Sequence, residues 1–208
     1  MSALIFGETS FVAVGAWNPA IIQPGWLHNQ FPDIIKDAYV PIQIMSGMAS
    51  GFRLEYSSFF IELNGVRLVF MPKNFDVSTF ELIKKLALGI HEKLYHTPIF
   101  AAGNNFAFKL EGNEIFTLNE FEKEEDIRKL YSFNEGYSFV GKNMCHTIAN
   151  KDCKVNINYI YTESANILSL NFDYSPPVNL VPMKTAAGKL EENFHEADNI
   201  RKLLVKGI

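Results

Sequence analysis

The sequence predicts an α+β fold, with a mainly antiparallel sheet and two long amphipathic helices packed on one face. Several segments alternate apolar and polar residues with the two-residue period of a half-buried strand. Two other segments repeat apolar residues with the period of a helix. Runs of strands follow one another with few helices between them. That order favours α+β over a doubly wound parallel sheet.

The clearest local signal is a β-hairpin. The apolar segments 59–63 and 66–71 flank the dipeptide Asn64-Gly65, which is typical of the two positive φ angles in a type I′ turn. Pro72 has no N–H to donate to a ladder, so we expect the second strand to end there. The sequence therefore predicts two strands joined by a tight two-residue turn.

A long helix is predicted directly after this hairpin. Ser78 and Glu81 have the spacing of a capping box, in which both side chains bond to backbone N–H groups at the helix start. We expect the helix to end before Pro98, because the residue before a proline avoids the α region. The apolar residues between these points fall on one stripe, which comprises Phe80, Ile83, Ala87, Ile90 and Leu94.

The remaining elements follow the same two periods. We predict a strand at 99–110, with a bulge or turn at 103–105, and a short helix after the second capping-box pair, Asn119 and Glu122. A closing helix is expected at about 185–206, with its apolar stripe from Leu190 to Leu204. Four further strands are expected, at 137–140, 144–148, 155–161 and 168–174.

The chain is long enough for a core of its own. A chain of 208 residues should bury roughly 70% of its unfolded surface, so neither a disulfide framework nor a structural metal is required. We expect a single domain over residues 1–208. Its element order is compatible with two structurally similar halves, 1–118 and 119–208, although these halves share no residue-level pattern.

Composition argues against several partners and locations. The net charge of −4 leaves no basic field for nucleic acid, although Tyr159, Tyr161 and Tyr174 could stack on bases from a sheet. No apolar run approaches the roughly 18 residues of a membrane span. Residues 1–8 lack a secretory leader and the chain has two cysteines. We therefore expect a cytoplasmic protein that binds neither nucleic acid nor membrane.

The sequence contains no motif with the spacing of a known catalytic or metal centre. Cys145 and His146 are adjacent and would point to opposite sides of a strand, and His91 and His96 are five residues apart. Glycine-rich phosphate loops and a Gly-x-Ser-x-Gly elbow are also missing. We expect no metal and no cofactor. A thiol nucleophile at Cys145, with His96 or His28 as its base, stays open, and His146 is a further candidate.

An aromatic segment at 16–31 is one candidate interaction surface. It contains Trp17, Trp26 and His28 and almost no charge. Tryptophan is enriched at protein interfaces, because its ring can be buried while its N–H stays wet. The same segment could instead cover one open end of the sheet.

Asn104 and Asn105 form a second candidate binding site. They follow Gly103 in the middle of a predicted strand. A bulge at this point would aim their amides at a ligand. The other interpretation is a plain turn, which these residue types favour for local reasons.

We expect a non-enzymatic protein that binds another protein or a second copy of itself as a homo-oligomer. Three features favour contact through apolar surface: the 18 phenylalanines, the low fraction of charged residues (20%) and the absence of a catalytic motif. The alternative is a small-molecule-binding or hydrolytic enzyme, whose site would lie between sheet and helix and would use His96, Cys145 or His146.

Overall fold

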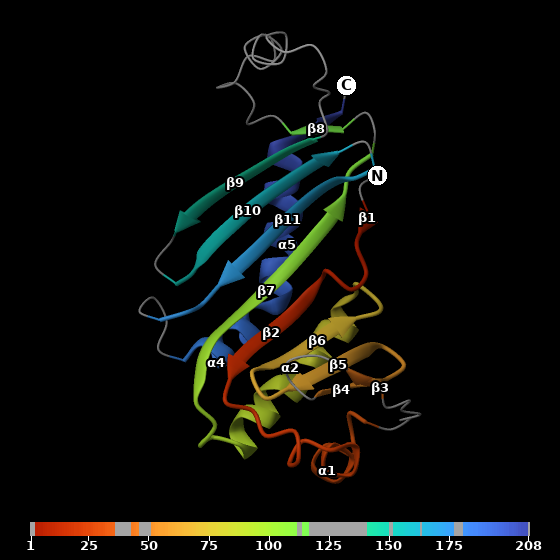
Figure 1. The fold of residues 1–208 in the computed structure, drawn as a ribbon, viewed down its shortest axis with the longest axis vertical. Helices are drawn as coiled ribbons and strands as arrows, with labels where there is room; N and C mark the ends of the chain where they lie inside the picture. The colour runs from red at the N-terminus through yellow and green to blue at the C-terminus, as the bar shows by residue number, and fades with distance from the viewer. Residues whose placement is uncertain are drawn as a thin grey trace.

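The computed structural model describes residues 3–35, 43–45, 51–111, 114–116, 141–149, 152–162, 164–176 and 181–207. Within these ranges the chain forms a twisted, antiparallel sheet of ten strands with helices packed on one face (Figure 1). This confirms the predicted α+β class. The strands lie in the order β3-β4-β5-β6-β2-β7-β11-β10-β9, and β1 pairs with β7.

The elements have the following bounds. Six strands precede the first long helix: β1 (Ala3–Leu4), β2 (Ser10–Gly15), β3 (Gln43–Met45), β4 (Gly51–Glu55), β5 (Phe59–Asn64) and β6 (Arg67–Pro72). The main sheet is completed by β7 (Ile99–Lys109), β9 (Gly141–Ala149), β10 (Lys154–Thr162) and β11 (Asn166–Asp173). Two short strands, β8 (Glu114–Phe116) and β12 (Val205–Gly207), pair with each other. The helices are α1 (Pro24–Gln30), α2 (Val77–Lys93), α4 (Pro182–Gly188) and α5 (Leu190–Leu204).

The strand order repeats between two halves of the sheet. In the first half, β2 is followed by the meander β4-β5-β6, whose last strand pairs with β2, and then by α2. In the second half, β7 is followed by the meander β9-β10-β11, whose last strand pairs with β7, and then by α4 and α5. The pattern therefore restarts at Ile99. The predicted boundary between residues 118 and 119 lies outside the described residues.

The predicted hairpin is present, but its turn differs by one residue from the prediction. Strands β5 and β6 pair so that Gly65 and Val66 form the turn. The side-chain oxygen of Asn64 accepts hydrogen bonds from the backbone N–H groups of Val66 and Arg67, at 2.8 and 2.7 Å. Neither Asn64 nor Gly65 has a positive φ. The type I′ prediction is wrong, because Asn64 closes this turn with its side chain rather than with a left-handed backbone.

Helix α2 lies where the sequence predicts it, with a different N-cap. The carboxylate of Asp76 accepts a hydrogen bond of 2.7 Å from the backbone N–H of Thr79, and the Ser78 hydroxyl donates to the same oxygen. The predicted capping box is wrong because Asp76 already fills the N-cap, while Glu81 pairs with Lys84. The predicted stripe is confirmed, since the buried side chains of α2 include Phe80, Ile83, Ala87 and Ile90.

Strand β7 runs through residues 103–105 without the bulge or turn predicted there. Its register with β2 and β11 is continuous over these residues. The irregularity lies nearer the start of β7, where Val14 pairs with Ala101 and Gly15 pairs with Ile99, so that Phe100 is the extra residue. Hydrogen bonds to neighbours on both sides outweigh the local turn preference. Gly103 suits a crowded strand, because a Cβ there would lie 2.7 Å from the carbonyl oxygen of Phe172.

The C-terminal region forms two helices where the sequence predicts one. Helix α4 ends at Gly188, α5 begins at Leu190, and residues 205–207 belong to β12. On α5, three residues of the predicted stripe are buried, namely Leu190, Asn193 and Ala197. The predicted strands at 144–148, 155–161 and 168–174 are present as β9, β10 and β11. The predicted short helix after Asn119 and the predicted strand at 137–140 lie outside the described residues.

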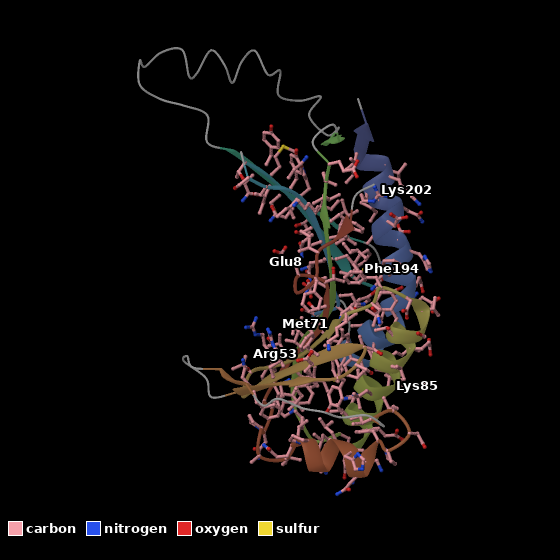
Figure 2. All side chains as sticks on the ribbon, turned by 90° about the vertical axis from the view of Figure 1, so that its right-hand side faces the viewer. Glu8, Arg53, Met71, Lys85, Phe194 and Lys202 are labelled. Atoms are coloured by element: carbon pink, nitrogen blue, oxygen red, sulfur yellow. The ribbon has the colours of Figure 1, made fainter. Side chains whose placement is uncertain are left out.

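The core lies between the sheet and helices α2, α4 and α5. Figure 2 shows these helices on one side of the sheet, whereas both ends of the sheet curve toward the other side. That second face is therefore concave and carries no described helix; we call it the uncovered face. Phenylalanine and leucine are equally frequent in the core, and its most deeply buried aromatic rings include Phe11, Phe70, Phe80 and Phe106.

Candidate functional site

The three candidate catalytic residues do not meet. His96 is exposed just before β7, with its ring centroid 3.7 Å from that of Tyr95. Cys145 and His146 are exposed on β9, and as neighbours in a strand they lie on opposite faces of the sheet. Strand β9 is the third strand away from β7, and each step is about 4.8 Å. No cysteine–histidine pair forms among these three residues.

The aromatic segment at 16–31 contributes four side chains to the core, namely Trp17, Ile22, Leu27 and Phe31. Trp17 is buried, and its indole N–H donates a hydrogen bond of 3.0 Å to the carbonyl of Ala13. Trp26 is half-buried and lies edge-on to Phe31, with ring centroids 5.9 Å apart. His28 is exposed on α1. Of Trp17, Trp26 and His28, only His28 is exposed, whereas Trp17 is buried in the core.

Asn104 joins the sheet to a helix. Its side chain is 0% exposed, and its Nδ2 donates a hydrogen bond of 2.9 Å to the carbonyl of Ala186 on α4. Its Oδ1 is buried without a hydrogen-bond partner among the described residues. Asn104 therefore points into the core and not toward a ligand on the uncovered face.

Asn105 belongs to a row of polar side chains that crosses five strands of the uncovered face. Each member bonds to the next, as Asn105 does to Ser10 (3.1 Å) and Asn171 does to Asn105 (2.6 Å). The row continues from Asn156 to Asn171 (3.0 Å) and from Thr147 to Asn156 (2.9 Å). We call it the asparagine row. Sequence alternation marked this face as polar, but only strand order reveals that its amides are neighbours.

Strand β9 is an edge of the sheet. Within the described residues it pairs only with β10. From Asn143 to Ala149 every side chain is exposed except that of the half-buried Met144. Natural edge strands are usually blunted by charges, prolines or bulges. The sequence of β9 offers only Lys142 for this purpose, and no other described strand pairs with this edge.

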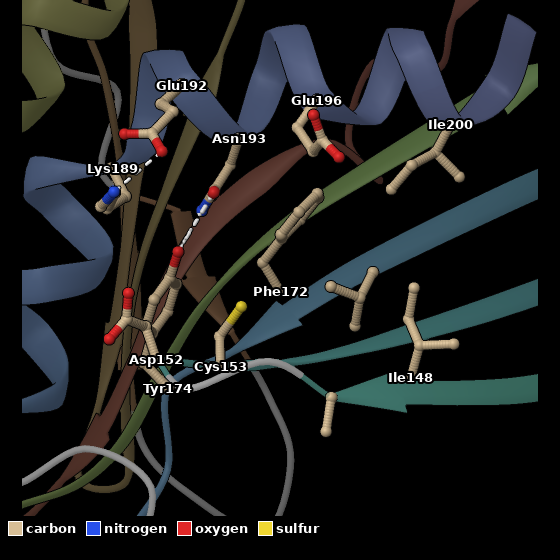
Figure 3. A pocket seen from close by; sticks show the side chains of 12 residues that line it. Ile148, Asp152, Cys153, Phe172, Tyr174, Lys189, Glu192, Asn193, Glu196 and Ile200 are labelled. Carbon is tan, nitrogen blue, oxygen red and sulfur yellow. Dashed lines mark hydrogen bonds and ion pairs between the residues drawn. The ribbon is translucent and has the colours of Figure 1, made fainter.

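A pocket of about 250 Å³ lies between α5 and the adjoining ends of β9, β10 and β11 (Figure 3). We call it the α5 pocket. Its apolar lining comprises Ile148, Ala149, Val155, Phe172 and Ile200. Its polar lining comprises Asp152, Cys153, Tyr174, Lys189, Glu192, Asn193 and Glu196. The sequence predicts a site between sheet and helix as one alternative, but it names none of these residues.

Two polar pairs hold the end of the α5 pocket at the helix start. The Tyr174 hydroxyl and the Asn193 side chain, both buried, hydrogen-bond to each other at 2.8 to 3.1 Å. Burial raises the pKa of Tyr174 above its ordinary value, so this group stays a neutral hydroxyl at physiological pH. Lys189 donates to Glu192 at 2.8 Å, and that bond raises the pKa of the lysine. Cys153 is buried in the wall.

The described part of the chain holds neither a metal centre nor a membrane-spanning helix. No group of three or more histidine, cysteine, aspartate or glutamate side chains there is placed to hold a metal ion. None of the described helices has the length and apolar character needed to cross a membrane.

Comparison with known proteins adds no assignment. The sequence matches no protein-family model and no curated protein.

Proposed function

We propose that this is a non-enzymatic binding protein that assembles with a second copy of itself through β9. The observation that carries the proposal is the edge strand β9, which is paired on one side within the described residues. From Asn143 to Ala149 it carries no lysine, arginine, aspartate or glutamate, and all of these side chains except Met144 are exposed. The outer N–H and C=O groups of such an edge are a template for another strand. A second copy is the partner that presents the same strand.

An antiparallel pairing of two β9 strands centred on Cys145 is self-complementary. On the uncovered face, Thr147 of one copy lies opposite Asn143 of the other. Hydroxyl and amide side chains form good cross-strand pairs, and Thr147 already bonds to an asparagine within its own chain. The pairing occurs twice around the two-fold axis.

The other face of this pairing brings no like charges together. Met144 of one copy lies opposite His146 of the other, and Ile148 lies opposite Lys142. Ile148 is 52% exposed in the single chain, so pairing also removes apolar surface from water. The two-fold axis is perpendicular to the sheet, so the two uncovered faces join into one longer concave surface for a further partner.

The alternative of a hydrolytic enzyme built on His96, Cys145 and His146 has no support from the geometry. A thiol nucleophile needs a base within hydrogen-bond reach, and His96 lies three strands away from Cys145. His146 is adjacent in sequence but points to the opposite face.

Size-exclusion chromatography with light scattering, over a range of protein concentrations, tests the assembly. We expect a dimer, and mild oxidation with diamide should join it covalently through the two Cys145 thiols at the axis. Cys145→Ser should abolish the covalent link but keep the dimer in light scattering. Cys153→Ser should leave the covalent link intact, because that side chain is only 3% exposed.

A charge placed at the axis tests the register. Cys145→Lys puts two ammonium groups opposite each other and should give a monomer. Asn74→Lys, at an exposed position before α2, is the matched control, because its new charge lies far from β9 and should leave the dimer intact. A monomer at every concentration would overturn the proposal, as would a dimer that never cross-links through Cys145.

A further inference from the structure

We propose that the α5 pocket binds a small organic cation with an apolar body. This inference does not depend on self-association, because the pocket is built within one chain. A volume of about 250 Å³ holds roughly eight water molecules at ~30 Å³ each. A ligand of about ten non-hydrogen atoms therefore fits.

The apolar part of the lining is suited to a ring or a short alkyl chain. Phe172 and Val155 come from the buried face of the sheet, and Ile200 faces them from α5 (Figure 3). Phe172 and Ile200 line the end of the pocket away from the pair formed by Lys189 and Glu192, and Val155 is the cross-strand partner of Phe172. Ligand sites commonly combine an apolar wall of this kind with a few convergent polar groups.

A buried side-chain amide gives the pocket a polar wall that can form further hydrogen bonds. Asn193 is 5% exposed, and its contacts with Tyr174 use one amide N–H and one oxygen lone pair. An asparagine side chain can donate twice and accept twice, and the structure gives no other partner to this amide among the described residues. Asn193 can therefore accept a hydrogen bond from a ligand ammonium group.

The charges of the lining favour a cation. Among the described residues of the lining, Asp152, Glu192 and Glu196 supply three carboxylates and Lys189 supplies one ammonium group. Lys189 is already paired with Glu192. Figure 3 shows the Glu196 carboxylate extending from α5 toward the strands of the sheet. An anion would meet this carboxylate excess at the mouth of the pocket, whereas a cation would offset it.

Three probes that share a phenyl ring separate charge from shape. We would titrate the full-length protein with phenethylammonium chloride, 2-phenylethanol and sodium phenylacetate, using calorimetry and amide chemical shifts. We expect phenethylammonium to bind with a dissociation constant of about 1 mM and to shift the amides of Phe172 and Asn193. The neutral alcohol should bind several-fold more weakly, and the anion more weakly still.

Matched variants test whether the Glu196 carboxylate causes the preference for a cation. Glu196→Gln should weaken binding of the cation about two- to fivefold, as expected for a solvent-exposed ion pair, and should leave binding of the alcohol unchanged. Ile200→Ala should weaken both. Glu8→Gln removes an exposed carboxylate on the other side of the sheet (Figure 2) and should change neither.

Several outcomes would overturn the inference. The first is binding of none of the three probes, and the second is equal or tighter binding of the alcohol or the anion. The third is a cation affinity that Glu196→Gln leaves unchanged. Raising the salt concentration should weaken binding of phenethylammonium and leave binding of 2-phenylethanol unchanged, because screening acts on the ion pairs and not on the apolar contacts.

Discussion

The side-chain amide of Asn104 donates a hydrogen bond of 2.9 Å to the backbone carbonyl of Ala186, which lies 82 residues further along the chain. The bond joins the central strand β7 to helix α4 in a place from which water is excluded, since Asn104 is 0% exposed. Helix carbonyls near a C-terminus have no partner within their own helix. The Asn104 side chain therefore donates a hydrogen bond to a carbonyl that has no backbone donor within its own helix.

We expect Asn104→Ala to lower the free energy of unfolding by about 1–3 kcal/mol, because it leaves the buried carbonyl of Ala186 without its donor. Urea denaturation followed by circular dichroism measures this. Asn74→Ala, at an exposed position before α2, is the matched control and should change stability by less than about 0.5 kcal/mol. Equal stability of the two variants would show that the bond contributes nothing.

Gly103→Ala should also destabilise the protein. The added Cβ would lie 2.7 Å from the backbone carbonyl oxygen of Phe172 and 3.2 Å from the side-chain nitrogen Nδ2 of Asn171. The two strands must therefore separate. We expect a cost of about 1–3 kcal/mol in thermal or urea unfolding. Gly25→Ala is the control, because nothing lies within 4 Å of its Cβ and alanine favours the helix α1. That variant should be as stable as the natural protein or more so.

Removal of the hydroxyl should lower the free energy of unfolding at one buried tyrosine but not at another. Tyr174→Phe breaks the bond with Asn193 and should cost about 1 kcal/mol. Tyr56→Phe should leave stability unchanged or raise it, because the Tyr56 hydroxyl is buried without a hydrogen-bond partner among the described residues. Urea unfolding at pH 7 compares the pair. A large loss of stability in Tyr56→Phe would contradict this account.

The Tyr56 hydroxyl should also affect how the stability of the protein falls at alkaline pH. Burial raises its pKa from 10.0 to about 12, so the folded state keeps a proton that the unfolded state releases. This contribution to stability is complete below pH 10 and is lost as the pH rises toward 12. Melting temperatures between pH 9 and 12 should therefore fall less steeply for Tyr56→Phe than for the natural protein.

Asp76 should contribute to the loss of stability at acid pH. Its hydrogen bond from the backbone of Thr79, followed by that from Ser78, lowers the pKa of this carboxyl below its ordinary value of 3.8. The stabilisation is present above that value and is lost as the pH falls through the lower, folded-state pKa. Asp76→Asn keeps an N-cap acceptor but removes the charge, so its melting temperature should depend less on pH between 5 and 2. Asp33→Asn, at an exposed position outside the helices, should leave that dependence unchanged.

The sequence alone could predict the features that depend on local period and composition. The stripe from Phe80 to Ile90 identified both α2 and its buried face, because one helix determines that pattern by itself. The alternation in 155–161 and 168–174 identified β10 and β11 in the same way. Their burial follows from it, since one face of each strand is apolar.

The sequence could not predict features that depend on which strands become neighbours. The turn preference of residues 103–105 is real, yet β2 and β11 hold them in a strand from both sides. Asp76 competes with Ser78 for the same helix start, and a spacing rule cannot rank the two. The α5 pocket draws its lining from three strands and a helix, so no short motif records it.

The sequence by itself therefore determined the α+β class, the helix faces and the apolar core, because each arises from side chains close together in the chain. The tertiary structure decided the asparagine row, the position of β9 at the edge of the described sheet and the α5 pocket. Ser10, Asn105 and Asn171 are far apart along the chain and become neighbours only when their strands pair. The physical reason is that sheet order is set by long-range hydrogen bonding and burial, which local residue patterns do not encode.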